Sequence, residues 1–223
     1  MKKNILFVLS NVSETKNGYK TGIWLDEFAV PYMKLQKEGH DITIASPEGG
    51  MVMVDAASIP ENPDPEKDFV CDVLENTEKL SDVDFELYDA VVVAGGHAAM
   101  FDLADNIDVA KLIGLCFYEN KIIAAICHGV AALLSAKTKE NRPIVEGKDV
   151  TGFSNAEEKL SKTEDLMPFL LESRLKEEGA VYSCGKPFTS YVIEDENLIT
   201  AQNPQSSEDF AKSILEKLRE NED

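Results

Sequence analysis

Short, largely apolar runs alternate with segments of helical periodicity along most of the chain. The apolar runs have the length of buried strands and occupy residues 4–9, 41–45, 89–94 and 122–126. Between them, residues 24–38 and 109–118 repeat apolar side chains at the spacing of one helix face. Apolar strands separated by helices are typical of a parallel sheet that is covered on both faces. The pattern therefore predicts an α/β fold with a mostly parallel central sheet.

The rest of the chain adds shorter elements to this pattern. Strands are expected at 180–183, 190–193 and 198–201, and a closing amphipathic helix at 207–221. Residues 49–68 contain three prolines and indicate a surface excursion, and Pro168 divides a charged helical stretch at 155–179. Pro31 predicts a kink in the first helix. Since no repeat or linker is apparent, we expect one domain over residues 1–223 with a small helical and loop insertion.

Composition narrows the classes of partner and compartment. The net charge is 22 − 41 = −19, and such an acidic surface repels phosphate backbones, which argues against nucleic acid. The apolar run that follows Lys2 and Lys3 is too short for a signal peptide, and no run approaches the length of a membrane span. The four cysteines form no CxxC pair, so their spacing argues against a cysteine-based zinc site and a thioredoxin-type site. We expect reduced thiols and a cytoplasmic location.

Cys127 stands at the most informative point of the chain. It follows the apolar run 122–126 and precedes His128, Gly129 and a helix-forming segment. A nucleophile on a sharp strand-to-helix turn is raised above the sheet, and the partial positive charge of a helix N-terminus stabilises a thiolate. The local pattern equally fits a buried core cysteine.

Three histidines are the candidate bases. His40 lies in a helix-to-strand turn, where a solvated loop residue is expected. His97 follows Gly95 and Gly96 at a strand end, where it either lines a pocket or caps a turn. Carboxyl ends of parallel strands share one edge, so this turn and Cys127 should be neighbours. No histidine follows His128, so the remote histidine of a glutamine-hydrolysing cysteine site is missing.

Glu27 is a candidate proton carrier. It lies beside the apolar face of the first helix, where burial would disfavour its charged form and allow proton transfer near neutral pH. The alternative is an exposed helix glutamate. The backbone N–H groups of Gly95 and Gly96 are candidates for an oxyanion hole, although glycine pairs are common in turns.

A series of motifs, in order along most of the chain, resembles the DJ/PfpI superfamily of class I glutamine-amidotransferase-like proteins, and within it the glyoxalase III branch of stress-inducible, chaperone-like proteins. The motifs are Thr21-Gly22 with Glu27 and Pro31, residues 45–50 with Val54-Asp55, residues 94–97, residues 125–129, residues 150–153 with Glu157-Glu158, and residues 200–204. Ala98 and Ala94 depart from this pattern, where glycine and proline are common.

The resemblance implies a flavodoxin-like three-layer sandwich that is usually a homodimer. It implies Cys127 as the nucleophile, Glu27 as its proton partner and His128 as the neighbouring imidazole. A further acidic residue orients the histidine, either Glu157 or Glu158, and the spacing from Phe153 favours Glu158. The substrate and oxyanion pocket is expected to include Gly95, Gly96, His97, Trp24 and Phe153.

The reaction implied is that of glyoxalase III, a carbon–oxygen lyase (D-lactate dehydratase) that detoxifies methylglyoxal to lactate without glutathione, metal or other cofactor. The substrate is then a small 2-oxoaldehyde, bound to Cys127 as a hemithioacetal. Two alternatives stay open. One is a deglycase that acts on protein or nucleotide adducts at the same site, and the other is a non-enzymatic holdase chaperone or thiol redox sensor.

Overall fold

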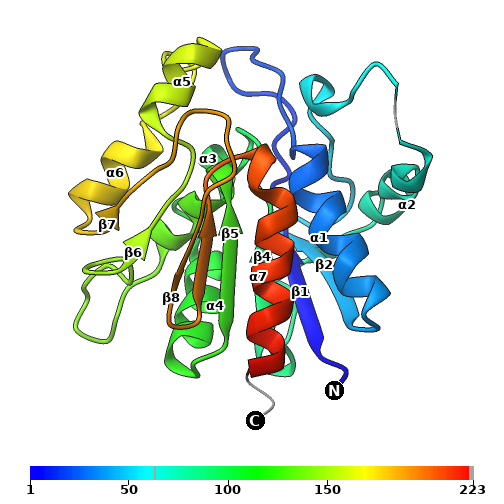
Figure 1. Ribbon diagram of the computed structural model, residues 1–223, viewed down its shortest axis with the longest axis vertical. Helices are drawn as coiled ribbons and strands as arrows, with labels where there is room; N and C mark the ends of the chain where they lie inside the picture. The colour runs from blue at the N-terminus through cyan, green and yellow to red at the C-terminus, as the bar shows by residue number, and fades with distance from the viewer. Residues whose placement is uncertain (63, 221–223) are drawn as a thin grey trace.

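A seven-stranded sheet forms the centre of the molecule (Figure 1). The computed structural model describes residues 1–62 and 64–220. The strand order is β3-β2-β1-β4-β5-β9-β8. The strands are β1 (Asn4–Val8), β2 (Asp41–Ser46), β3 (Glu78–Lys79), β4 (Ala90–Val93), β5 (Ile122–Ile126), β8 (Val192–Asp195) and β9 (Leu198–Ala201). Neighbouring strands are parallel except β8, which is antiparallel to β9. The predicted mostly parallel sheet is confirmed.

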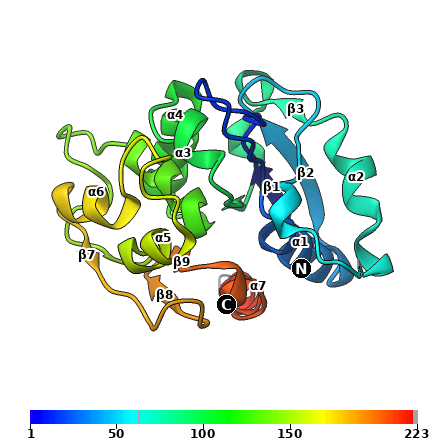
Figure 2. The same cartoon turned by 90° about the horizontal axis from the view of Figure 1, so that it is seen from above.

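Helices cover both faces of this sheet, which gives the expected three-layer sandwich (Figure 2). Side chains of successive strand residues point to opposite faces. In β1, Leu6 and Val8 belong to the core shared with α3 (Ala99–Asp102) and α4 (Ile107–Tyr118). Ile5 and Phe7 belong to the second core, under α1 (Leu25–Lys37) and α7 (Ser207–Glu220). The continuous apolar strands are therefore explained by burial on both sides.

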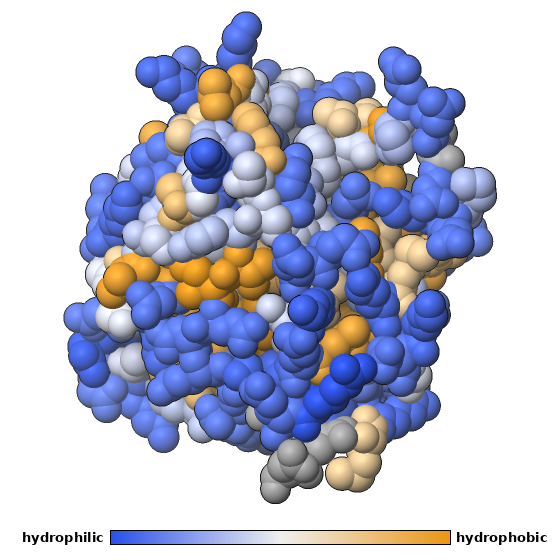
Figure 3. Space-filling model, in the orientation of Figure 1, coloured by the Kyte–Doolittle hydropathy of each residue, from blue (hydrophilic) through white to orange (hydrophobic). Residues whose placement is uncertain are grey.

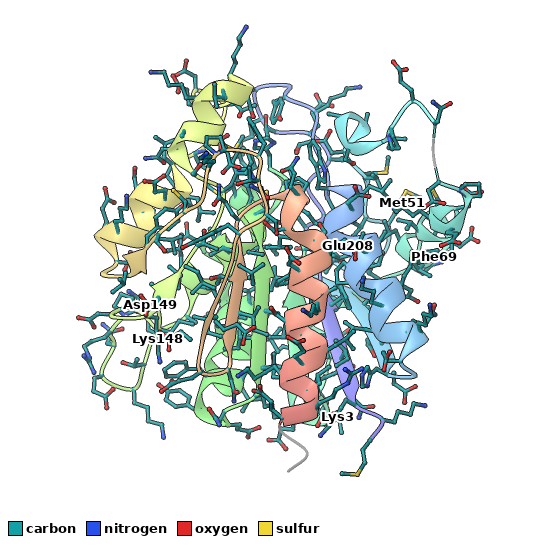
Figure 4. All side chains as sticks on the ribbon, viewed as in Figure 1. Lys3, Met51, Phe69, Lys148, Asp149 and Glu208 are labelled. Carbon is teal, nitrogen blue, oxygen red and sulfur yellow. The ribbon has the colours of Figure 1, made fainter. Side chains whose placement is uncertain are left out.

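The first helix keeps its predicted apolar face. Phe28, Tyr32 and Leu35 are buried, and α1 packs beside α7, where Lys34 and Glu208 form an ion pair of 2.6 Å (Figure 4). Pro31 lies inside the helix, which runs without a break from Leu25 to Lys37. Since proline has no N–H, the carbonyl of the residue four positions earlier, Glu27, loses its regular helical donor.

Several elements were missed from sequence because they are short or lack periodicity. The excursion at 49–68 leads into α2 (Phe69–Leu74) and β3. The charged stretch forms α5 (Asn155–Ser161) and α6 (Leu171–Glu177), on either side of Pro168 as predicted. The strand expected at 180–183 is β7 (Val181–Tyr182), which pairs with β6 (Asp149–Val150) in a separate two-stranded sheet. Asn221, the last residue of the expected closing helix, lies outside the described residues.

The face that carries α1 and α7 is largely hydrophilic, with apolar atoms gathered in smaller areas (Figure 3). The Lys148 ammonium donates hydrogen bonds to the carboxylates of Asp195 and Glu196. Lys148 lies away from the carboxyl ends of the parallel strands (Figure 4). In the part of the chain that the structure describes, no helix has both the length and the apolar character required to cross a bilayer.

Candidate active site

Cys127 occupies a strained turn between β5 and a 3₁₀ helix, η5 (Cys127–Ser135). Its φ is +57°, in the left-handed region, which costs a residue with a Cβ on the order of 1 kcal/mol or more. Gly129 permits the turn, because an added Cβ would lie 2.7 Å from the carbonyl oxygens of Val93 and Ala94. The predicted strand–turn–helix arrangement is present, with a tighter helix than expected.

The sulfur of Cys127 is less accessible than the sequence suggested. The residue is only 3% exposed, whereas Cys71 and Cys184 lie on the surface. Burial, followed by the charge of Glu27 and its hydrogen bond, raises the pKa of the Cys127 thiol well above its ordinary value. The backbone N–H groups of His128 and Gly96 act in the opposite direction. Desolvation therefore opposes, more strongly, the stabilisation of the thiolate expected from the helix end.

Glu27 is fully buried, so the exposed-glutamate alternative is wrong. It meets Cys127 over Gly95, where an added Cβ would lie 2.4 Å from Glu27 Oε2 and 2.9 Å from Cys127 Cβ. Burial raises the pKa of Glu27 to about 8, against weaker lowering effects from Cys127, Gly95 and Gly96. Its carboxyl oxygens interact with these groups without a hydrogen bond of regular geometry. At neutral pH the carboxyl is mostly protonated.

The protonation state of Glu27 affects the pKa of the Cys127 thiol. A neutral carboxyl carries no charge, so the electrostatic effect of Glu27 on the thiol pKa disappears while the proton stays on the acid. The two groups titrate as a pair that strongly disfavours two negative charges. The pair formed by Glu27 and Cys127 therefore holds at most one negative charge at a time.

His128 is held between the sulfur and a buried carboxylate. Its Nδ1 lies 3.4 Å from Cys127 Sγ, and its Nε2 lies 2.9 Å from Oε2 of Glu158. An ionised carboxylate only accepts, so Nε2 carries the ring proton and Nδ1 presents a lone pair to the thiol. Burial lowers the pKa of His128 to about 4, helped by the charge of His97 and opposed by Glu158. The imidazole is therefore neutral and can accept a proton.

The same carboxylate also binds His97, which sequence reasoning placed only in the pocket. Oε1 of Glu158 lies 3.2 Å from His97 Nε2, and His97 Nδ1 lies 3.2 Å from the hydroxyl of Tyr19. Burial acts to raise the pKa of Glu158, but the hydrogen bonds from His128 and His97 outweigh it, and the pKa falls well below its usual range. Tyr19 was missed, because it lies in a loop before the first helix without a periodic or motif signal.

Glu157 and Glu158 point to different partners, which decides between them. Glu157 is fully buried and, within the described residues, accepts five hydrogen bonds, from Ser154 (twice), Phe188, Gln202 and Asn203. It also closes the capping box of α5 with Ser154. Glu158 is the carboxylate beside His128, as its spacing from Phe153 had favoured.

The glycine pair and two aromatic residues complete the site. The backbone N–H of Trp24 donates to the Gly95 carbonyl. Gly96 has a φ of +98°, and an added Cβ there would lie 2.2 Å from the carbonyl oxygen of Gly22. The Phe153 ring lies 4.5 Å from that of His128. A cavity of about 330 Å³ opens beside His97. Its lining comprises Tyr19, Trp24, Asp55, Ala57, His97, Phe153, Ser161, Thr163, Phe188, Pro204 and Gln205.

Comparison with known proteins gives this arrangement a family. The model of the DJ-1/PfpI family matches residues 24–217, which is most of the chain. The protein belongs to this family. A glutathione-independent glyoxalase of Schizosaccharomyces pombe is 30% identical, over 97% of this chain and 98% of its own.

Solved structures agree with this assignment. The crystal structure of glyoxalase III from Candida albicans is 25% identical, covers 96% of this chain and 97% of its own, and superposes with a TM-score of 0.87. The Rapid Encystment Protein of Francisella tularensis is 39% identical, with a TM-score of 0.91 and coverage of 97% and 99%. The sandwich and the family inferred from the motifs are confirmed.

The pKa of Glu27 predicts a pH-dependent stability. A folded-state pKa raised to about 8 from 4.5 gives a contribution that is complete below pH 4.5 and is lost as pH rises through 8. At ~1.4 kcal/mol per pKa unit, the wild type should lose a few kcal/mol relative to Glu27→Gln over this range. Urea unfolding of both proteins at several pH values measures the difference. The exposed change Glu48→Gln controls for general charge, and parallel curves for wild type and Glu27→Gln would contradict the prediction.

The two neighbouring glutamates should differ in their effects on stability. Glu157→Ala leaves several buried donors without an acceptor and should lower the free energy of unfolding by roughly 3 kcal/mol or more. Glu158→Ala removes the acceptor of only two imidazole N–H groups, and should cost less. Chemical denaturation of both variants tests this, and an equal or reversed order would show that Glu157 is not the structural member of the pair.

Proposed function

We propose that the protein is a glutathione-independent glyoxalase that converts methylglyoxal, or a close 2-oxoaldehyde, to the 2-hydroxy acid. The observation that carries the proposal is the buried array of Cys127, neutral His128 and ionised Glu158, with the protonated acid Glu27 close to the same cysteine. The glyoxalase names of the relatives support the same reaction.

Catalysis begins with the thiol proton. Nδ1 of His128, 3.4 Å from the sulfur, accepts it, and Glu158 stabilises the resulting imidazolium through Nε2. The N–H groups of Gly96 and His128 stabilise the thiolate. Because Glu27 is neutral at this stage, no second negative charge opposes the ionisation.

The thiolate then adds to the aldehyde carbon and gives a hemithioacetal, whose oxygen takes its proton from Glu27 or from the His128 imidazolium. The group that gave up this proton then accepts the hydrogen of that carbon as a proton and delivers it to the adjacent carbonyl carbon through an enediol. The first carbon is thereby oxidised to a thioester and the second reduced to an alcohol, so no external oxidant is needed. Water cleaves the thioester, releases lactate and returns the thiol. The backbone N–H groups at Gly95 and Gly96 are the proposed oxyanion donors.

Trp24, His97 and Phe153 line the cavity beside the site, which is the proposed place for the aldehyde. At about 330 Å³ the cavity exceeds what a three-carbon aldehyde fills. This volume favours, as a second candidate, a deglycase that acts on larger aldehyde adducts with the same cysteine.

The proposal extends to assembly and location. Membership of the family supports a homodimer, and four free cysteines fit a reducing, cytoplasmic environment. Sedimentation of the pure protein tests the dimer.

Lactate production by the pure protein, with methylglyoxal and without added thiol, tests the function directly. Cys127→Ala should abolish it, because the nucleophile is lost. Cys71→Ala, Cys116→Ala and Cys184→Ala are matched controls and should keep near-normal activity, since none of these sulfurs contacts the array. Lactate formed by Cys127→Ala, or none formed by the wild type, would refute the proposal.

The acid and the orienting carboxylate should have separate kinetic effects. Glu27→Gln should lower kcat by on the order of 10²-fold or more, because the amide keeps the shape but cannot carry a proton. Glu158→Ala should lower kcat less than Cys127→Ala does, since the nucleophile remains. Single-turnover rates with both variants provide the measurement, and a fully active Glu158→Ala protein would remove Glu158 from the mechanism.

A further inference from the structure

Two imidazole nitrogens and one carboxylate converge beside the cavity that His97 lines. His97 Nε2 lies 3.2 Å from one oxygen of Glu158, and His128 Nε2 lies 2.9 Å from the other. The ligand atoms of the three residues all lie within 4.8 Å of one another, and all three side chains are buried. Within residues 1–62 and 64–220, no other trio of His, Cys, Asp or Glu side chains comes together in this way.

This spacing is close to that of a metal centre. Zn²⁺ binds His nitrogen and carboxylate oxygen at roughly 2.0–2.2 Å, so tetrahedral ligand atoms lie about 3.3 Å apart. The two Nε2 atoms lie 3.2 and 2.9 Å from the two oxygens of Glu158, and all the ligand atoms lie within 4.8 Å of one another, so small side-chain shifts bring them to this separation. Two histidines and one carboxylate leave a fourth position for a water molecule, and a cavity lies beside His97.

The outer nitrogens of both rings are also partnered. A metal-bound histidine generally donates its second N–H to an acceptor, which fixes its orientation. Nδ1 of His97 faces the Tyr19 hydroxyl, and Nδ1 of His128 faces Cys127 Sγ. If a cation takes both Nε2 lone pairs, each ring moves its proton from Nε2 to Nδ1. Tyr19 Oη and Cys127 Sγ then accept these N–H groups, and both rings stay neutral.

We propose that His97, His128 and Glu158 form a binding site for a divalent transition cation such as Zn²⁺, and that its occupancy switches the Cys127 centre off. A ligated His128 keeps its proton on Nδ1 and cannot accept another from the thiol. The cation also takes the carboxylate that stabilises the imidazolium. Nitrogen ligands select Zn²⁺, Co²⁺ or Ni²⁺ over Mg²⁺ and Ca²⁺, which prefer oxygen.

The proposed cation site does not include the sulfur of Cys127. The sulfur lies on the Nδ1 side of His128, away from the converging Nε2 atoms. A variant without the sulfur should therefore still bind the cation. This property makes the binding test independent of enzymatic activity, whereas the inhibitory consequence rests on the proposed function.

Calorimetric titration of chelator-treated protein with ZnCl₂ tests the site. Wild type and Cys127→Ala should each bind one Zn²⁺ per chain. His97→Gln and Glu158→Gln should weaken binding by about 100-fold or more, and Tyr19→Phe, which removes an outer partner, by roughly 10-fold. His40→Gln, a histidine outside the cluster, is the matched control and should bind normally. Melting curves without metal confirm that each variant is folded. If His97→Gln does not fold, Tyr19→Phe takes its place in the binding test.

Co²⁺ provides a spectroscopic test of the ligands. Its complex should show visible d–d bands without a sulfur-to-cobalt charge-transfer band, and MgCl₂ should give no binding. Binding that survives both His97→Gln and Glu158→Gln, or that disappears in Cys127→Ala, would overturn the site.

The effect on turnover is measured separately. Lactate formation by the wild type should fall in proportion to Zn²⁺ occupancy and return with a chelator. Full activity of the Zn²⁺-loaded protein would overturn the switch. A metal-free protein that makes no lactate while Cys127→Ala still binds Zn²⁺ would refute the proposed function and leave the site standing.

Discussion

The chemistry of the site depends on one buried carboxylate, Glu158, which accepts hydrogen bonds from two histidines at once. Because an ionised carboxylate offers only lone pairs, it fixes the proton of each ring on Nε2. That choice leaves Nδ1 of His128 free to act on the thiol and Nδ1 of His97 free to accept from Tyr19. A single anion, Glu158, thus determines which atoms donate and which accept in the series of hydrogen bonds that runs from Tyr19 to Cys127.

Burial shapes the other half of the site. Desolvation raises the pKa of Glu27 and of Cys127 together, so the pair resists holding two charges and one proton remains available beside the sulfur. Desolvation also lowers the pKa of His128 and keeps the ring neutral. The same physical effect therefore prepares both an acid, Glu27, and a base, His128, next to the cysteine. No charged side chain needs to approach from solvent.

Much of this arrangement was readable in the sequence, because strong local signals coincided with it. The apolar run 122–126 followed by Cys127, His128 and Gly129 predicted the strand and the turn, and the resemblance of the motifs to a known family implied the role of Cys127 and favoured Glu158 by its spacing from Phe153. Tyr19 left no such signal, since a loop residue acquires its role only through a contact 78 positions away. The sequence left the burial of Glu27 open between two alternatives, because it depends on how closely α1 approaches Gly95 and Gly96. Strands of two residues, such as β6 and β7, are too short for a periodic pattern.

The consecutive residues Glu157 and Glu158 on α5 have different roles, one structural and one at the histidines. The number of residues in the segment that leads into α5 is therefore as important as their identity. Neighbouring positions on a helix are about 100° apart, so Glu157 faces the C-terminal strands while Glu158 faces the histidines. Removing one residue just ahead of α5 would move Glu158 into the position of Glu157 and place Lys159 between the two imidazoles. Adding one residue would put Ala156 into the buried hydrogen-bond cluster. Single-residue insertions and deletions in this connection should therefore be far less tolerated than side-chain changes on the exposed face of the same helix.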